Sequence, residues 1–591
     1  MRIMKRINNY IKPYLQAIPS FFSYQVVSKL ILVLATMIFT RLAYIFLEAT
    51  GRIAITSGDF KFLFTTWQGI IILSIGIVSL IVYVVFDCVA KIIVSEEIIN
   101  PKGKNIWRIM KESIINIPKF FNLVGVLIVL FIAFLIPLVG FGISISLTKN
   151  FKIPNFITSV IYATPVYLVL YIIGLIIISY IAFTHLFTLH FIVIKGLKPK
   201  EANKESTKLM KNNKKKTIKK YFSFAISMIL IEILSVIIFS FVPLIIISLI
   251  KMGTNAARFV NIFVCLNSVV VISVVNLLLL PLQVLELTRI FNSLNNDENV
   301  KIPLKRKLKK GWLIRRIIAI LILVTIISVL LFATFDYVFP KERNIWIIAH
   351  RGGGTLDVEN SIEGLNKAIE QGVYGSEIDV QRTKDGRYII NHDSTFKRLA
   401  GIDKTAQEMT LEEIKNLEIE DKYGKAAVAT LEEMLDTAKG KIKLFIELKG
   451  DSADEKMAND VIQIVKERDM LDECIFISLS YDLIDYIETT HPEATTGYLY
   501  YFSFGKVTGL NCDYLILEEQ PATADMIIQI KSSGKKAIVW TVDSDNSLYR
   551  FLDSNVDGII TNEVKNAKTT QERLDSRTDV ERIRDFFFIN D

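Results

Sequence analysis

The chain has 591 residues, of which 51% are hydrophobic, with a mean hydropathy of +0.40 and a formal net charge of +9. This length predicts more than one domain, and the hydropathy is too high for an ordinary soluble protein of this size. The basic residues gather in short loops between apolar runs and form no stripe with interleaved aromatic residues, which argues against a nucleic-acid partner.

Nearly all the long apolar runs lie in the first 339 residues. A membrane-spanning helix needs about 20 mostly apolar residues. Residues 1–339 are therefore predicted to form a multi-pass α-helical membrane domain with about seven transmembrane helices. The segments that meet the requirement are 26–49, 66–94, 118–147, 163–194, 221–250, 259–291 and 314–338.

Lysine and arginine residues alternate between dense and sparse from one loop to the next. Dense clusters lie in 95–119, 195–220 and 292–316, whereas the intervening loops carry only pairs such as Arg52 and Lys61. Cytoplasmic loops carry the excess of basic residues, so this order predicts a cytoplasmic N-terminus. With seven spans, the C-terminal part is then extracytoplasmic, at the outer face of the plasma membrane, and the lipid bilayer is the first expected partner.

From residue 340 to 591 the pattern changes to short β-branched runs that alternate with amphipathic stretches. Eight strands separated by helices in about 240 residues match the count and size of a TIM (β/α)8 barrel, an α/β fold. A ninth run, 388–393, follows the second strand too closely for a crossover helix, so we expect a hairpin arm there and an irregular insertion over 394–442. The predicted barrel strands are 345–350, 376–382, 443–448, 474–480, 495–500, 514–519, 536–542 and 557–561.

Acidic side chains stand on two of these strands in an i,i+2 arrangement. Glu377 and Asp379 share one face of the second strand because side chains alternate along a strand, and Glu447 and Lys449 repeat the spacing on the third. We expect them to point into the barrel mouth, where TIM barrels carry their active sites. Three converging carboxylates repel one another unless a cation neutralises them, and oxygen ligands predict a hard one, Ca²⁺ or Mg²⁺.

Two histidines and two cations complete this set of strand-end residues. His350 and Arg351 end the first strand, and His392 ends the hairpin arm. Histidines titrate near neutrality and suit acid and base roles, while Arg351 and Lys449 offer positive charge to an oxyanion such as phosphate. Acid, base, metal and cations together predict phosphoryl or phosphodiester chemistry.

The combined motifs resemble the glycerophosphodiester phosphodiesterase family, and the architecture is similar to members with an N-terminal multi-pass membrane domain. The resemblance covers about residues 345–565. It implies a metal-dependent hydrolase of glycerophosphodiesters, of lipid-headgroup or glycerol-phosphate type, that releases an alcohol and glycerol phosphate. The motifs are HRGGG (350–354), ENS (359–361), SEIDVQRTKDG (376–386), NHD (391–393), TLEEML (430–435), FIELK (445–449), WTVD (540–543) and DGIITN (557–562).

The resemblance also implies a role for each site residue. It leaves open which histidine is the acid and which is the base. Asn360 is similar to a residue that supports the metal site or contacts the phosphate, and Trp540 to an apolar wall of the pocket. The implied sets are a metal site of Glu377, Asp379 and Glu447, an acid–base pair of His350 and His392, and phosphate contacts from Arg351 and Lys449.

Three positions depart from the family pattern. Val358 stands where a proline is usual, VATLEE lacks its proline, and the last strand ends in Asn562 where an acid is common. None of them removes a predicted metal ligand or histidine, so they concern loop geometry and substrate fit.

Two other functions fit parts of the sequence. One is a phospholipase D-like barrel enzyme acting on choline-type phospholipids. The other is a lipid-handling membrane scaffold with a vestigial barrel, which the loss of any of the predicted metal ligands or histidines would have supported; all are present.

Overall fold

The computed structural model describes residues 2–135, 155–250, 252–295, 300–303 and 310–588. The chain forms two compact units. The first comprises most residues up to Val338, and the second comprises Phe339–Asp591 together with Leu47–Gly69 and the short stretch Pro154–Ile157. The domain boundary at 339/340 stays a prediction, but the early segment Leu47–Gly69 groups with the C-terminal unit.

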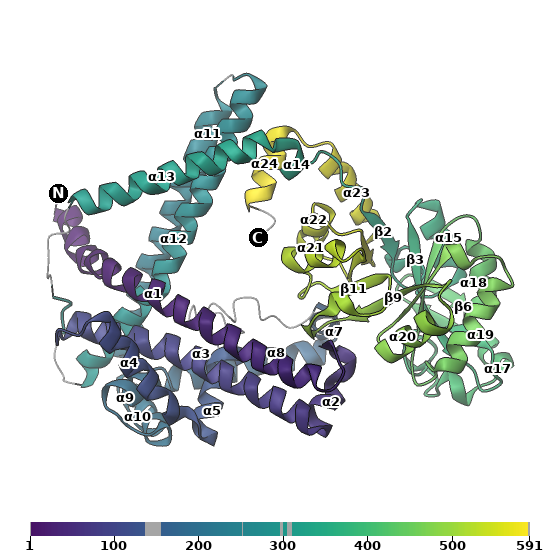
Figure 1. Cartoon of the computed structure of the whole chain (residues 1–591), viewed down its shortest axis with the longest axis horizontal. Coiled ribbons are helices and arrows are strands. Elements are labelled where there is room, and N and C mark those ends of the chain that lie inside the picture. Colours follow the sequence, from purple (N-terminus) through teal and green to yellow (C-terminus); the bar gives the residue numbers. More distant parts are fainter. Residues whose placement is uncertain (1, 136–154, 251, 296–299, 304–309, 589–591) are drawn as a thin grey trace. The chain divides into compact units, whose positions relative to one another are not determined.

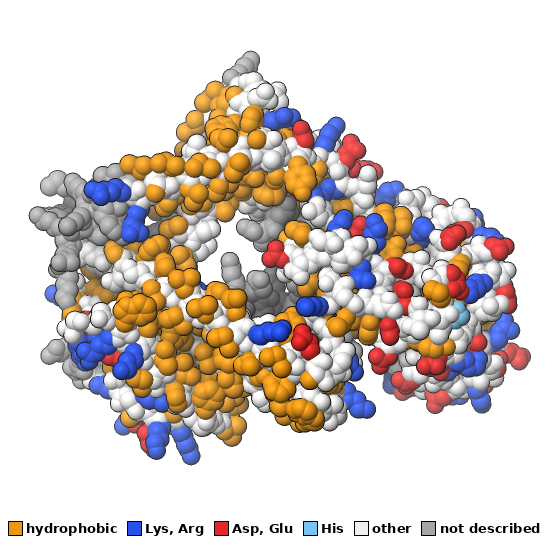
Figure 2. Space-filling model, in the orientation of Figure 1, with side chains coloured by type: hydrophobic (Ala, Val, Ile, Leu, Met, Phe, Trp, Pro, Cys, Tyr) orange, Lys and Arg blue, Asp and Glu red, His pale blue; other side chains and the backbone are white. Residues whose placement is uncertain are grey.

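The N-terminal unit is helical throughout its described residues, and Figure 2 shows hydrophobic side chains over much of its visible surface. Its helices are α1 (Arg2–Glu48), α3 (Trp67–Ile99), α4 (Ile106–Asn116), α5 (Leu123–Leu130), α7 (Asn155–Ala163), α8 (Pro165–Thr184), α9 (Thr188–Ile194), α10 (Pro199–Val236), α11 (Val242–Ser248), α12 (Thr254–Asn295), α13 (Lys310–Ala333) and α14 (Phe335–Val338), with π-helical turns at Phe131–Leu135 and Ile237–Phe241.

Four helices within the described residues are long and apolar enough to cross a membrane. They match four of the predicted segments, and the remaining three lie in helices that are bent, interrupted or shorter, so the count of seven stays a prediction. The segment 221–250 is divided by a π-helical turn, and the last one contains the shorter apolar helix Ile318–Ala333. The four candidate spans are Gln16–Glu48, Trp67–Ile99, Pro165–Ile194 and Thr254–Asn295.

The predicted segment 118–147 begins at a sharp bend. The axes of Ile106–Phe120 and Leu123–Leu135 differ by 113°. The cause is local: Pro118 lies in a 3₁₀ turn, and the Asn122 side chain accepts a hydrogen bond from the Gly125 backbone at 3.0 Å and so caps a new helix. The second half of that predicted segment lies outside the described residues.

Buried charges in the N-terminal unit are neutralised by neighbours. Asp87 forms an ion pair with Lys91 one turn later on α3. Glu286 accepts hydrogen bonds from the Tyr14 hydroxyl at 2.6 Å and from Arg289 Nε at 2.7 Å. Buried charges are tolerated when they are paired in this way, and the Tyr14–Glu286 hydrogen bond also joins α1 to α12.

The C-terminal unit is built on a nine-stranded sheet whose neighbours run parallel, except for the antiparallel pair β3–β4. The order β2-β13-β12-β11-β9-β8-β7-β3-β4, with β2 also paired to β3, closes it into a barrel. This confirms the predicted TIM barrel with its hairpin arm. The strands are β2 (Trp346–Ala349), β3 (Gly375–Arg382), β4 (Tyr388–Ile390), β7 (Lys443–Leu448), β8 (Cys474–Ser478), β9 (Thr495–Tyr500), β11 (Tyr514–Glu518), β12 (Lys536–Trp540) and β13 (Gly558–Thr561).

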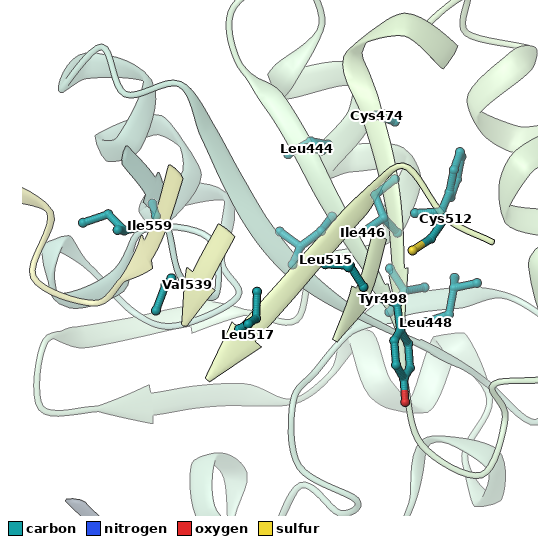
Figure 3. Close-up of a cluster of buried hydrophobic side chains, with 14 of the residues drawn as sticks. Leu444, Ile446, Leu448, Cys474, Tyr498, Cys512, Leu515, Leu517, Val539 and Ile559 are labelled. Carbon is teal, nitrogen blue, oxygen red and sulfur yellow. The ribbon is translucent and has the colours of Figure 1, made fainter. Parts of the chain in front are cut away.

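Helices surround the barrel strands, as Figure 1 shows for α15, α18, α19 and α20. Alternate strand residues face these helices and form the main buried cluster; Figure 3 shows part of it, including Leu444, Ile446 and Leu448 on β7. The helices are α15 (Ile362–Glu370), α18 (Leu431–Ala438), α19 (Glu455–Lys466), α20 (Tyr481–Thr490), α21 (Ala524–Ser532), α22 (Asp545–Leu552), α23 (Val564–Asp575) and α24 (Asp579–Phe588).

The insertion after β4 is more ordered than its sequence suggests. Short helices α16 (Lys397–Ala400) and α17 (Leu411–Lys415) and the hairpin β5–β6 (Glu418–Asp421, Gly424–Ala427) pack around a buried cluster of their own that includes Phe396. The expectation of an irregular insertion is therefore wrong. Its apolar residues are too scattered along the chain to show a helical or strand period, because they meet only in three dimensions.

One side of the barrel lacks its helix. Between β9 and β11 the described stretch 501–513 contains only the strand β10 (Ser503–Gly505) and a 3₁₀ turn. A strand from the far end of the sequence, β1 (Ala54–Thr56), pairs antiparallel with β10. The short helix α2 (Phe60–Thr65) follows β1 in the same unit.

Strand β1 is packed as part of the barrel domain. Ile55 is only 1% exposed, and Ala54 belongs to the same buried cluster as Tyr498 of β9. The hydroxyls of Thr56 and Tyr498 are 2.5 Å apart. Gly505 has a φ of +118°, and a Cβ there would lie 2.6 Å from the Ala54 Cα, so this pairing requires glycine. Residues 54–56 thus replace part of the missing helix layer.

We predict that the C-terminal unit loses stability when β1 cannot pack. Ile55→Asp places an unpaired charge in a buried position and should destabilise the unit by about 3 kcal/mol. The exposed Ile53, which is 42% accessible, provides the matched control Ile53→Asp. Hydrogen exchange of the β9–β11 amides in the full-length protein should accelerate in Ile55→Asp alone; equal protection in both variants would contradict the role of β1.

Candidate active site

Three carboxylates meet at the carboxyl ends of two neighbouring strands. Residues Glu377, Asp379 and Glu447 are buried, and one oxygen from each lies within 4.8 Å of the others. The cause is strand register: Asp379 on β3 stands opposite Glu447 on β7, and Glu377 lies two residues earlier on the same face. The i,i+2 pattern of the sequence therefore becomes one acidic cluster.

Two side chains hold Asp379 from opposite sides. Lys449 Nζ donates to Asp379 Oδ1 at 2.9 Å and to Glu447 Oε2 at 3.1 Å. Asn360 Nδ2 donates to Asp379 Oδ2 at 2.8 Å. Asn360 thus contacts a carboxylate of the cluster, which favours its supporting role over a direct contact with phosphate.

The electrostatics of the cluster are those of crowded acids. Burial and the neighbouring carboxylates raise the pKa of Glu377 well above its usual range. Burial, only partly offset by Lys449, also raises the pKa of Glu447. Although burial opposes it, the Lys449 ammonium lowers the pKa of Asp379. Positive charge is therefore insufficient for all three groups to ionise together.

The three carboxylates fit a divalent cation. Glu377 Oε2 accepts the Arg351 backbone N–H at 2.8 Å, but Glu377 Oε1 is buried and has no hydrogen-bond partner within the described residues. An oxygen-only donor set with a buried unpartnered oxygen suits a hard cation such as Ca²⁺ or Mg²⁺. Bringing these acids together makes the predicted ligand set available; which ion binds stays a prediction.

His350 follows β2 and is oriented by a chain of hydrogen bonds. Its Nδ1 lies 2.9 Å from Asn562 Oδ1, while Asn562 Nδ2 donates to Asp543 Oδ2 at 2.7 Å. A carboxylate only accepts, so the amide oxygen of Asn562 must face His350, and Nδ1 of the imidazole must carry the proton. The other nitrogen, Nε2, lies 3.9 Å from Glu377 and keeps its lone pair. Burial, and next Arg351, lower the pKa of His350 to about 3.

His392 lies after β4 and has a different partner. Its Nδ1 is 2.8 Å from Asp393 Oδ1, and Arg398 Nε donates to Asp393 Oδ2 at 2.6 Å. Although burial opposes it, these hydrogen bonds lower the pKa of Asp393. Nδ1 of His392 thus faces a carboxylate, in contrast to the neutral amide beside His350.

Arg351 lies next to the cluster with unusual backbone geometry. It has a positive φ of 48°, and its guanidinium is 3.4 Å from Glu359, which Arg398 also binds. Arg351 Nε is buried without a hydrogen-bond partner in the described part of the chain. An unsatisfied guanidinium donor is consistent with the predicted contact to a phosphate oxygen.

Trp540, at the end of β12, is half-buried, and its Nε1 donates to the Ile516 carbonyl at 3.2 Å. Its ring packs against the buried cluster inside the barrel. The predicted role as an apolar wall of the pocket stays a prediction.

Three supporting residues had no assigned role in the sequence. Gln381 Nε2 donates to the backbone oxygens of Asn391 at 2.7 Å and Asp393 at 2.8 Å, and so holds the loop of the second histidine. Gln381 continues the i,i+2 spacing of Glu377 and Asp379, and this spacing is the sequence feature that could have placed its side chain on the same face. Asp543 acts through Asn562, 19 residues away, and Arg398 joins Asp393, five residues before it, to Glu359, 39 residues before it. No local pattern reveals these partners.

Comparison with known proteins identifies the family of both parts of the chain. Residues 350–566 match the glycerophosphoryl diester phosphodiesterase family, and residues 7–332 match the membrane domain of glycerophosphoryl diester phosphodiesterase. A glycerophosphodiester phosphodiesterase of Caldanaerobacter subterraneus is 30% identical over 227 residues, covering 37% of this chain and 93% of its own length.

Two further proteins are similar over the same region. Glycerophosphodiester phosphodiesterase GDPD4 of Arabidopsis thaliana is 25% identical over 233 residues, covering 37% of this chain and 70% of its own. The crystal structure of a glycerophosphodiester phosphodiesterase from Parabacteroides distasonis is 27% identical, with a TM-score of 0.35, covering 39% of this chain and 98% of its own.

The hydrogen-bond chain to His350 predicts a specific effect of changing Asn562. Asn562→Ala removes the acceptor that fixes the imidazole tautomer and should lower kcat about 10–100-fold with little change in KM. Asn562→Asp keeps an acceptor for Nδ1 and should retain more activity. The half-buried Asn566, whose side-chain amide donates to Asp545 at 2.6 Å, gives the control Asn566→Ala. Equal activity of Asn562→Ala and this control would contradict the role of Asn562.

Proposed function

The chain belongs to the glycerophosphoryl diester phosphodiesterases that carry an N-terminal membrane domain, and from this premise we propose that it hydrolyses membrane-derived glycerophosphodiesters at the outer membrane surface in a metal-dependent reaction. The observation that carries the proposal is the convergence of Glu377, Asp379 and Glu447 beside two differently partnered histidines. The products are an alcohol and glycerol phosphate. The intact set disfavours a vestigial barrel.

His350 is proposed as the general base. Its Nδ1–H donates a hydrogen bond to Asn562 Oδ1, so Nε2 is the atom able to accept a proton from the attacking water or substrate hydroxyl. The low pKa of the imidazole keeps that nitrogen unprotonated at neutral pH.

His392 is proposed as the general acid. Asp393 accepts a hydrogen bond from its Nδ1, so Nε2 is the nitrogen that would deliver a proton to the leaving alkoxide. Gln381 and Arg398 fix the loop that carries this pair. The two imidazoles therefore have different Nδ1 partners, an amide oxygen and a carboxylate, which suits them to different roles.

Positive charge for the phosphate is proposed to come from Arg351, Lys449 and the cation. A divalent cation, Ca²⁺ or Mg²⁺, would neutralise the carboxylates and draw charge from the phosphate oxygens. Arg351 offers its unsatisfied Nε, and Lys449 keeps its charge because Asp379 and Glu447 outweigh the effect of burial and raise its pKa. Both residues orient the substrate while the acidic cluster holds the ion.

The proposed location follows from two connections between membrane helices and the barrel domain. The candidate span Gln16–Glu48 ends six residues before β1, and the next begins at Trp67. The second connection runs from α14, which ends at Val338, to β2 at Trp346. Chains this short reach only about 3.3 Å per residue, so the barrel lies close to the bilayer. The β1–β10 pair also supports a first loop on the same side as the barrel, as the basic-loop alternation predicts.

Removal of the cation tests the chemistry. Glu447→Gln removes one carboxylate ligand of the ion, and EDTA removes the ion itself. Each should therefore abolish cleavage of a soluble glycerophosphodiester. His350→Ala should lower kcat about 10²-fold or more. The exposed Glu455→Gln should behave as wild type.

Add-back of Ca²⁺ or Mg²⁺ to the EDTA-treated enzyme identifies the ion, and phosphorus NMR of the products separates glycerol phosphate release from the phospholipase D-like alternative. Full activity in EDTA would refute metal dependence.

The orientation can be tested on intact cells. External protease should release fragments of the barrel domain, whereas the basic segment 195–220 should stay protected because dense positive charge favours the cytoplasmic side. Immunoblots with tags in each region give the readout. Cleavage within 195–220 before the membrane is permeabilised would show the opposite orientation.

A further inference from the structure

The N-terminal unit contains a large apolar hollow away from the acidic cluster. It has a volume of about 690 Å³, within the usual range for small-molecule sites. Its walls come from α3, α5, α8 and α10, with Leu127, Phe131, Ile181 and Ala225 among the lining residues. Such a hollow accepts a hydrocarbon chain, but its apolar walls alone do not select a ligand.

Polar atoms without partners stand in the wall of this hollow. Thr188 is 3% exposed and Thr217 is 1% exposed, and neither hydroxyl has a hydrogen-bond partner within the described residues. Asn203 Oδ1, in the same lining, is also unpartnered. Buried polar atoms are rarely left unsatisfied, so a ligand with hydrogen-bonding groups at one end is indicated.

A second, basic hollow adjoins the first. It shares His185 and Asn203 with the apolar hollow and is lined by Lys204, Lys208 and Lys211, with a volume of about 490 Å³. No acidic side chain lines either hollow in the described part of the chain. The ligand that fits both is apolar at one end and anionic at the other.

The wall between the hollows is firmly built. Ser206 Oγ donates to the Thr184 carbonyl and accepts the Phe187 backbone N–H, both at 3.1 Å, which joins the start of α10 to the turn around His185. His185 Nδ1 is 3.0 Å from the Ile181 carbonyl, so the proton lies on Nδ1 and Nε2 is the nitrogen left for a ligand. The site is thus preformed where an acyl chain would meet a headgroup.

We propose that this paired hollow is a binding site for an anionic phospholipid of the bilayer. The acyl chain occupies the apolar hollow, glycerol or ester oxygens meet the Thr188 and Thr217 hydroxyls, and the phosphate lies among Lys204, Lys208 and Lys211. In the orientation proposed above, the site opens toward the cytoplasmic leaflet, whose anionic lipids attract clustered lysines. The membrane unit then carries a lipid site separate from the catalytic cluster.

The test titrates the detergent-purified full-length protein with phosphatidylglycerol or phosphatidylcholine and counts bound lipid by native mass spectrometry. Wild type should prefer phosphatidylglycerol. The triple variant Lys204→Gln, Lys208→Gln, Lys211→Gln should lose about tenfold or more of that preference. The matched triple Lys214→Gln, Lys215→Gln, Lys219→Gln, on the same helix but outside the hollow, should keep it.

Two further variants test the apolar part. Ala225→Trp fills the hollow and should abolish binding of both lipids, and Thr188→Val with Thr217→Val should weaken binding severalfold. Elution volume and melting temperature verify folding of each protein. Equal loss of preference in the two lysine triples, or wild-type binding by a folded Ala225→Trp, would overturn the proposal.

Discussion

The structure of the C-terminal unit around its acidic cluster depends on how the repulsion among three buried carboxylates is compensated. Parallel pairing of β3 and β7 places Asp379 opposite Glu447, and the period of the strand brings Glu377 to the same face. Like charges at this spacing cannot all ionise without compensation. Lys449, Asn360 and the backbone N–H of Arg351 each satisfy part of the demand. The Arg351 backbone and Lys449, the residue after β7, each reduce the repulsion among these carboxylates, and a bound cation would reduce it further.

The two histidines have different hydrogen-bond partners at Nδ1, on which their different proposed roles rest. A neutral amide, Asn562, orients His350, and the carboxylate of Asp393 orients His392. Both neighbours are themselves held, by Asp543 and Arg398 respectively. The proposed difference between base and acid therefore rests on side chains that need not touch substrate.

Much of the barrel and its site could be predicted because the signals are local. Strand-like runs bounded by turns predicted eight barrel strands, and the i,i+2 pairs Glu377/Asp379 and Glu447/Lys449 predicted the acidic cluster. Partners that meet only in the fold could not be read from the chain, as with Asn562 and His350. Strand β1 has three residues, too few for any periodic signal, and its role depends on a helix missing from the barrel.

Strand β1 makes the barrel domain discontinuous in sequence, with a consequence for biosynthesis. Thr56 and its partner Tyr498 are 442 residues apart. At about 5–20 residues per second, a ribosome needs roughly 20 to 90 seconds to make that interval. Strand β1, which follows the first candidate span, is therefore made long before its partners β9 and β10 and stays unpaired until they are synthesised. Completion of the hydrolase domain therefore requires the first loop and the barrel to lie on the same side of the membrane, which couples folding of this domain to insertion of the first helices.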